Sequence, residues 1–259
     1  MMELIADGES FRETFMGLCA EANRNILLCS PYVKESITKD IIANKKRDSE
    51  IELITAILMG SFRRRSSDLS AISHLLESGC RIYNCNGVHA KFYIFDNEKC
   101  IITSANLTEG GLGKNHEAGV ITNDRETLRA ATKYYQTLKT DETSGFVRMH
   151  AVAEIEGMLS RLPPYVEEKM PVPDTLFPNE IEAICEGFSG WRLDVFNETD
   201  KLPVPEFDSE SVAMMSERLR AKYPRNNNRE AKVRQQLQEL RDLGLIQFVR
   251  PGVYRRLWR

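Results

Sequence analysis

Two short segments of the sequence carry side chains that together suit phosphate chemistry. The first contains His89 and Lys91, and the second contains Ser104 and Asn106. Residues two apart on a β-strand share a face at a spacing of about 6 to 7 Å, so each pair is expected to point one way. A hairpin around residues 96–99 would set the two strands side by side. Lysine supplies charge, serine and asparagine donate hydrogen bonds, and histidine can act as nucleophile or proton carrier, so the set suits a phosphate.

Two acidic residues complete the pattern with different expected roles. Glu117, on the strand beyond, is expected to hold the far ring nitrogen of His89 and fix its tautomer. Asp96 has the opposite parity to His89 on a regular strand, so it is expected to face away from the site and to be structural. An isolated histidine on a strand is more often structural than catalytic, so the prediction depends on the residues taken together.

This combination resembles the signature of the phospholipase D superfamily, in which His-x-Lys, four residues and Asp precede a Ser-x-Asn segment and a downstream Glu. The matching residues are His89, Lys91, Asp96, Ser104, Asn106 and Glu117. The resemblance covers roughly residues 1–160 in pattern but is specific only over 89–117, and Thr103 stands where a glycine is usual. It implies an α/β/α sandwich and a catalytic site that needs no metal or other cofactor.

The chain contains one His-x-Lys motif, whereas many members of that superfamily build one site from two. The other three histidines are followed two residues later by Leu76, Ala118 and Val152. The resemblance therefore implies a homodimer with a shared site. One His89 would attack phosphorus to give a phosphohistidine, and the other would protonate the leaving oxygen and later activate water.

The C-terminal part of the chain predicts a winged helix. Val233, Leu237 and Leu240 form an apolar stripe on a helix over residues 228–244, and a strand, a tight turn and a second strand follow. Residues 250–256 would form the wing. The side chains expected to contact DNA are Arg229, Lys232, Arg234, Gln235, Gln238, Arg250 and Arg255.

This stretch resembles the C-terminal DNA-binding domain of the Dam-replacing group of restriction endonucleases. The matching segments are residues 191–195, 223–228, 232–246 and 252–254. That group pairs the module with a metal-dependent nuclease core, so its metal ligands do not carry over. Trp191 and Trp258 are expected to be core aromatics rather than a pocket for a modified base.

The elements that must position these residues alternate between strand and helix before a proline-rich stretch. Strands are expected at residues 25–30, 50–59, 81–84, 88–95, 100–104 and 118–122, and helices at 10–23, 37–45, from 66 or 67 to 78, 124–138 and 143–159. Five of the ten prolines lie between Pro163 and Pro178. We therefore expect a linker at 163–179 between a nuclease domain at 1–162 and a DNA-binding domain at 180–259.

Charge is distributed unevenly along the chain. The formal net charge of -3 argues against a polycation, but the segment from Arg220 onward carries +8, so residues 1–219 carry -11. Such a difference suggests that the basic module faces a polyanion. Lys91 and the run Arg63-Arg64-Arg65 are the cations expected to admit DNA to the acidic first domain.

Composition also bears on compartment and redox state. The longest apolar runs, such as residues 54–59, are far shorter than a membrane span, and the start lacks the pattern of a secretory signal. We expect a cytoplasmic protein without a membrane partner. Six cysteines are too few for a disulfide framework and are expected to be reduced, and Cys80 and Cys85 lack a second pair that would complete a zinc site.

The sequence thus predicts a sequence-specific double-stranded DNA endonuclease of the restriction type, with DNA and a cognate DNA methyltransferase as partners. Two alternatives stay open. A lipid phosphodiesterase would use the same histidine and lysine, but it would leave the winged helix unexplained and the chain has no evident membrane-binding amphipathic stretch. A DNA-binding regulator with an inactive nuclease fold would be expected to lose part of the site.

Overall fold

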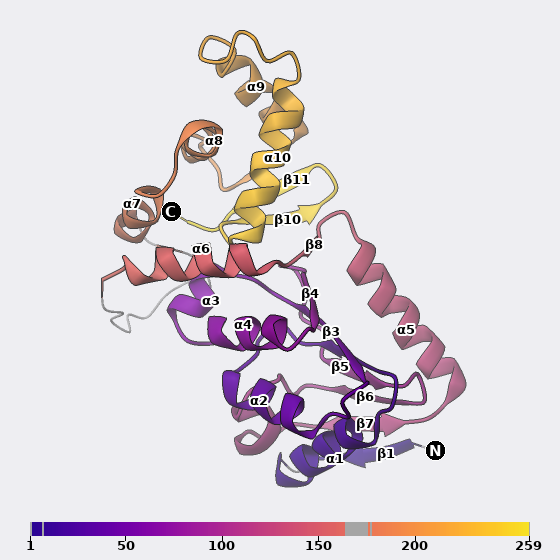
Figure 1. Cartoon of the computed structure of the whole chain (residues 1–259). Helices are drawn as coiled ribbons and strands as arrows, with labels where there is room; N and C mark the ends of the chain where they lie inside the picture. Colours follow the sequence, from indigo (N-terminus) through magenta and orange to yellow (C-terminus); the bar gives the residue numbers. More distant parts are fainter. Residues whose placement is uncertain (1, 7, 164–175, 177, 259) are drawn as a thin grey trace. The chain divides into compact units, whose positions relative to one another are not determined.

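The computed structural model describes residues 2–6, 8–163, 176 and 178–258, which divide into two compact units (Figure 1). The first unit comprises Met1–Ala56 and Arg65–Met149, and the second comprises Ile57–Arg64 and His150–Arg259. Most of the expected linker at 163–179 lies outside the described residues. Its last residues, from Pro178, already belong to a helix.

The first unit is built on an eight-stranded mixed sheet with the order β1-β7-β6-β5-β2-β3-β4-β8. The pairs β2–β3 and β3–β4 are parallel and the other neighbours are antiparallel. The strands are β1 (Met2–Ile5), β2 (Asn25–Cys29), β3 (Glu50–Thr55), β4 (Arg81–Asn84), β5 (Phe92–Phe95), β6 (Lys99–Thr103), β7 (Gly119–Thr122) and β8 (Gly145–Phe146).

Helices cover both faces of this sheet. Successive strand residues point to opposite faces. On β5, the Phe92 ring meets Tyr135 of α5 (Arg125–Thr140), with centroids 6.2 Å apart, whereas the Tyr93 ring meets Phe15 of α1 (Gly8–Glu21) at 5.0 Å. Helix α1 packs against α2 (Glu35–Asn44), which packs against α4 (Leu69–Glu77). The expected α/β/α sandwich is therefore confirmed.

A tight turn joins β5 to β6 and sets their register. Asp96 and Asn97 both have positive φ, at 55° and 57°, a conformation that Asp and Asn tolerate better than most residues. The Asp96 carboxylate accepts hydrogen bonds from the backbone N–H groups of residues 23, 24 and 25 at 2.7, 2.7 and 2.9 Å. Burial opposes ionisation, but these donors outweigh it and lower the pKa of Asp96. The contacts of Asp96 are structural, and they anchor the turn to the start of β2.

The second unit contains the expected winged helix. Its elements follow one another as α8 (Gly190–Asp200), β9 (Glu206–Asp208), α9 (Ser209–Arg218), α10 (Arg229–Asp242), β10 (Ile246–Arg250) and β11 (Val253–Arg256). The three strands form a sheet with the order β10-β11-β9. The stripe of Val233, Leu237 and Leu240 is buried, so α10 packs on its apolar face, and Gln236 and Arg241 are buried beside the stripe.

The second unit also includes segments that the sequence assigned to the nuclease domain. These segments are α3 (Met59–Arg63) and nearly all of α6 (Met149–Ser160). Helix α7 (Pro178–Cys185) belongs to the same unit. The expected strand over 50–59 ends at Thr55, because the next residues bond elsewhere: the Met59 N–H donates to the Gly244 carbonyl at 3.2 Å. No helix in the described part of the chain is both long and apolar enough to cross a membrane.

Arg63 is not available for the role that the sequence suggested. Its Nε lies 2.8 Å from the Glu180 carboxylate, and the two side chains are only 11% and 7% exposed. Its guanidinium also donates to the Pro163 carbonyl at 2.6 Å. The expectation that Arg63 admits DNA was wrong, because its partner lies more than a hundred residues away in the sequence and fixes the charge inside the second unit.

Replacing Gly244 by alanine should destabilise the second unit more than the same change at Gly190. Both residues have positive φ, +73° and +57°, which costs a side chain about 1 to 2 kcal/mol. At Gly244 an added Cβ would also lie 2.5 Å from Met59 N and 2.7 Å from Ile57 O, for a further ~1 to 3 kcal/mol, whereas Gly190 has open space. Denaturant unfolding of both variants measures the difference, and equal losses would contradict the packing of α3 described here.

Candidate functional site

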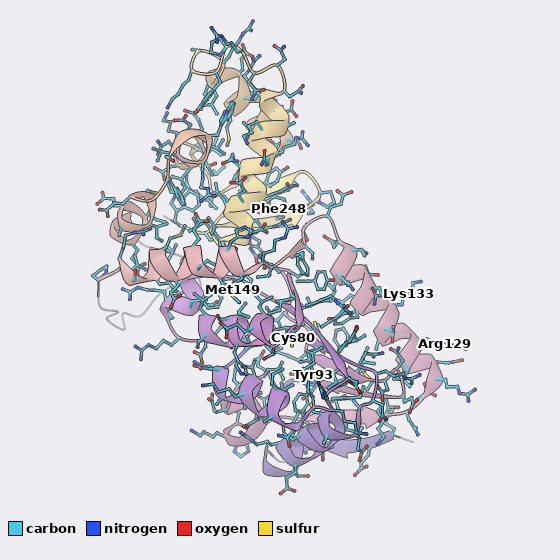
Figure 2. The ribbon with its side chains drawn as sticks, in the orientation of Figure 1. Cys80, Tyr93, Arg129, Lys133, Met149 and Phe248 are labelled. Atoms are coloured by element: carbon cyan, nitrogen blue, oxygen red, sulfur yellow. The ribbon has the colours of Figure 1, made fainter. Side chains whose placement is uncertain are left out.

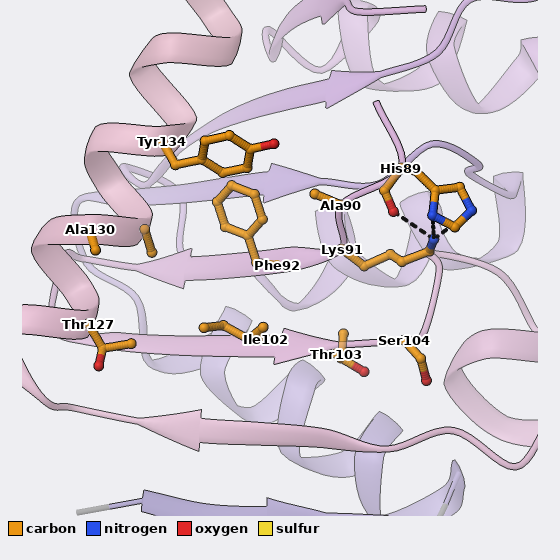
Figure 3. Close-up of a pocket in the computed structure, with 11 residues that line it drawn as sticks. His89, Ala90, Lys91, Phe92, Ile102, Thr103, Ser104, Thr127, Ala130 and Tyr134 are labelled. Carbon is orange, nitrogen blue, oxygen red and sulfur yellow. Dashed lines mark hydrogen bonds between the residues drawn. The ribbon is translucent and has the colours of Figure 1, made fainter. Parts of the chain in front are cut away.

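His89 and Lys91 lie together just before β5. The Lys91 Nζ is 3.3 Å from His89 Nδ1 and 3.5 Å from Nε2, and it donates to the His89 carbonyl at 2.8 Å (Figure 3). His89 is exposed, whereas Lys91 is only 9% exposed. Burial lowers the pKa of Lys91, against a weaker opposing effect of the Glu117 carboxylate. A nucleophilic nitrogen and a cation thus meet at one accessible point.

Ser104 directly follows β6, and the residues just before β7 bind its hydroxyl. Its hydroxyl donates to one Glu117 carboxylate oxygen, and Asn115 Nδ2 donates to the other at 3.3 Å. The Ser104 hydroxyl also accepts from the Ala118 N–H at 3.2 Å. This arrangement follows from the register of β6 and β7, because Thr103 pairs with Gly119 and thereby brings Ser104 opposite the residues before β7.

The expected contact between Glu117 and the His89 ring is not made. Within the described chain, Glu117 has Ser104 and Asn115 as its hydrogen-bond partners. The carboxylate therefore orients the serine hydroxyl and contributes negative charge near Lys91.

Asn106 follows in the loop after β6 and is backed by a residue that the sequence reasoning missed. Ser30, directly after β2, lies fully buried with its hydroxyl 3.4 Å from Asn106 Oδ1, and it accepts the Leu107 N–H at 3.1 Å. Gly111, in the short π-helix η1 (Gly110–Lys114), packs closely on the backbone of Asn106, since an added Cβ at Gly111 would lie 2.3 Å from Asn106 O. The signal that the sequence offered for Ser30 was a polar residue at the end of an apolar strand.

The expected residues therefore gather at one edge of the sheet. Because β5 is antiparallel to both β2 and β6, the end of β2, the start of β5 and the end of β6 meet there. His89, Lys91 and Ser104 line one cavity, Glu117 bonds to Ser104, and Asn106 lies next to Ser30 at the end of β2. Charge, directed donors and a nucleophile at one point suit a phosphodiester. Among the described residues, no group of three or more His, Cys, Asp and Glu side chains is placed to hold a metal.

The side chains expected to contact DNA lie on α10 and on the β10–β11 hairpin, and most are engaged within the protein. Arg234 pairs with Glu230, Lys232 bonds to Gln235, Arg229 donates to the Asn226 carbonyl, and Arg255 pairs with Glu206. Gln238 and Arg250 are exposed, and within the described part of the chain no hydrogen bond or ion pair engages them. Arg250 lies at the tip of the hairpin, where a wing would meet a phosphate backbone.

The two tryptophans occupy different environments. Trp258 is buried, stacks on Phe196 with centroids 4.6 Å apart, and donates to Asp200 at 2.8 Å, as a core aromatic does. Trp191 is half-buried and stacks on Tyr223 at 3.8 Å. The expectation of a core role therefore fits Trp258 better than Trp191.

Comparison with known families matches two separate segments of the chain to two different families. Residues 17–139 match the family described as "Cardiolipin synthase, PLD-like domain", and residues 188–256 match the "Dam-replacing HTH domain". The chain thus joins a segment that matches a phospholipase D-like domain to a segment that matches a Dam-replacing helix-turn-helix domain. Members of the phospholipase D superfamily are phosphodiesterases, which include nucleases and cardiolipin synthases.

Individual relatives cover about half of the chain. Minor cardiolipin synthase ClsB of Bacillus subtilis is 26% identical over 139 residues, which are 52% of this chain and 34% of that protein. Among solved structures, Nuc from Salmonella typhimurium is 21% identical with a TM-score of 0.46, over 52% of this chain and 93% of its own. NucT from Helicobacter pylori is 18% identical with a TM-score of 0.46, over 53% and 94%.

Ser104→Ala and Glu117→Gln should damage the phosphodiesterase reaction as one unit. Each single change is expected to lower kcat/KM by about 10- to 100-fold, because the carboxylate acts by orienting the hydroxyl. The double variant should then be little worse than either single variant. Steady-state kinetics of the unchanged protein, the two single variants and the double variant on one phosphodiester substrate complete the double-mutant cycle. The control is Glu126→Gln, which changes an exposed glutamate on α5. Additive losses would show that Glu117 acts on a different group.

Proposed function

We propose that this protein is a sequence-specific endonuclease that hydrolyses duplex DNA without a metal ion. The observation that carries the proposal is the His89–Lys91 pair beside the Ser104–Glu117 pair, in a chain that also has a Dam-replacing helix-turn-helix domain. The first pair supplies phosphodiester chemistry and the helix-turn-helix domain supplies a means of choosing DNA. The proposed biological setting is restriction, with a cognate DNA methyltransferase as partner.

In the proposed reaction a ring nitrogen of one His89 attacks phosphorus. The bond from phosphorus to one ester oxygen breaks, which leaves a phosphohistidine, and the departing oxygen takes a proton from the His89 of a second subunit. That second histidine then removes a proton from water as the water oxygen displaces the first histidine. Lys91, Ser104 and Asn106 would bind the non-bridging oxygens and stabilise the charge that develops on them.

The second subunit is part of the proposal for a chemical reason. The histidine that attacks phosphorus uses its ring nitrogen to form the new bond. It lies on the side of phosphorus opposite the leaving oxygen, so it is badly placed to protonate that oxygen. The motif occurs once per chain, so the simplest source of a second, opposed imidazole is another copy of the same chain.

A lipid phosphodiester is the competing substrate. It is favoured by the cardiolipin synthase relative and by the apolar lining of the cavity beside His89, which Phe92 and Ile102 provide. Both substrates would use the same catalytic side chains. The Dam-replacing domain favours DNA, since a lipid enzyme has no use for it.

His89→Ala should abolish cleavage of plasmid DNA in excess EDTA while leaving DNA binding intact. The unchanged protein should cut under the same conditions, and His150→Ala, which removes another exposed histidine, should cut normally. Gel analysis of cleavage and a mobility shift on the same DNA provide the two readouts. Cleavage that required magnesium, or that survived the loss of His89, would overturn the mechanism.

Arg250→Ala should weaken DNA binding by a salt-dependent amount. Loss of one phosphate contact is expected to reduce the slope of log K against log salt concentration by about 1 and to affect all sequences alike. Arg47→Ala, a change at another exposed arginine outside the helix-turn-helix domain, is the control. Fluorescence anisotropy across a salt series gives the slope, and an unchanged slope would remove Arg250 from the proposed interface.

A further inference from the structure

A groove runs from the catalytic side chains across the sheet face that α5 covers (Figure 3). It encloses about 690 Å³. His89, Lys91 and Ser104 lie at one end, Phe92 and Ile102 form its floor, and α5 forms its wall. The residues that α5 contributes are Thr127, Ala130, Ala131 and Tyr134.

The groove exists because α5 presents small side chains to this part of the sheet. Ala130 and Ala131 stand one turn before Tyr134, so they leave space above the strands. Ile102 remains 46% exposed although β6 has neighbours on both sides, and Tyr134 is 49% exposed. Ile102 and Tyr134 together leave an apolar surface open beside the catalytic side chains, which an occupant can cover.

The lining of the groove favours a flat apolar group. The rings of Tyr134 and Phe92 have centroids 5.8 Å apart and are tilted by 32°, and Ile102 lies directly across from Phe92 on the neighbouring strand. Thr127 contributes the one other hydroxyl among the α5 residues that line it. Aromatic surfaces of this kind stack nucleobases without regard to sequence.

The position of the groove indicates which molecule would supply the flat apolar group. The groove is continuous with the side chains that would hold the phosphate, so its occupant is attached to the phosphate on one side or the other. In DNA, that group is a nucleobase within one or two nucleotides of the scissile bond.

We propose that the groove is a nucleobase subsite, in which a base close to the scissile phosphate stacks on Tyr134 over the floor made by Phe92 and Ile102. The inference depends on the proposed cleavage of DNA and adds a requirement to it. A base in this groove has left the duplex stack, so the nucleotide beside the cut is unpaired when the reaction occurs. The helix-turn-helix domain would select the site, and Tyr134 would fix the register of the strand at His89.

The test combines Tyr134 variants with substrates that lack one base. Cleavage sites are first mapped by sequencing the ends of digested DNA, and duplexes are then made with an abasic nucleotide at each position flanking the scissile phosphate. With the unchanged protein, one of the abasic duplexes should be cut about 5- to 150-fold more slowly than the intact duplex, the equivalent of roughly 1 to 3 kcal/mol.

Tyr134→Ala should show a similar loss on the intact duplex and no further loss on the abasic one, because the two changes remove the same contact. Tyr134→Phe keeps the ring and should restore the sensitivity to the missing base. Phe146→Ala, at an exposed aromatic residue that packs on Tyr83 elsewhere in this unit, should leave that sensitivity unchanged. Thermal melting of each variant establishes that the fold is retained.

Two outcomes overturn the inference without touching the proposed function. Equal cutting of intact and abasic duplexes by the unchanged protein would show that no base is bound there. A change of oligomeric state in Tyr134→Ala on size-exclusion chromatography would assign the groove to a second copy of the chain. Turnover of phosphatidylglycerol vesicles that depends on Tyr134 would assign the groove to a lipid chain and would also favour the competing lipid substrate over DNA. Absence of any DNA cleavage by the unchanged protein would instead reject the proposed function itself.

Discussion

The antiparallel register of β5 and β6 is the constraint on which the proposed catalytic arrangement depends. Phe92 pairs with Ile102, so the residues just before β5 and just after β6 emerge at the same edge of the sheet. The turn at Asp96 and Asn97 sets this register, and the three backbone donors that bind Asp96 attach it to β2. A slip of one residue would turn every side chain on one strand to the other face and separate the proposed nucleophile from its oxyanion donors.

The same register determines the electrostatics of the site. Lys91 reaches the His89 ring from a buried position (Figure 3). The Ser104 hydroxyl is oriented by Glu117, which lies just before β7. The site therefore contains a cation, a carboxylate and directed hydroxyl and amide groups, all within a few residues of the ends of β5, β6 and β7. Figure 2 labels Tyr93 in the same unit, and its side chain is fully buried.

Sequence reasoning located what depends on local pattern and missed what depends on packing. The strand at residues 81–84, the β5–β6 hairpin and the winged-helix order follow from periodicity and turn residues, which are local. The contact of Glu117 with Ser104 depends on the β6–β7 register, and that of Arg63 with Glu180 joins distant segments. The groove depends on how α5 crosses the sheet, so the sequence could not connect Tyr134 with His89.

The central claim is that His89 becomes covalently bonded to phosphorus during DNA cleavage. Two successive in-line displacements, first by histidine and then by water, each invert the configuration at phosphorus. The most direct test is therefore the stereochemical course of cleavage at a phosphorothioate of one configuration, with the reaction run in isotopically labelled water and EDTA. Net retention is the result that this account predicts, and net inversion, which signifies direct attack by water, would contradict it.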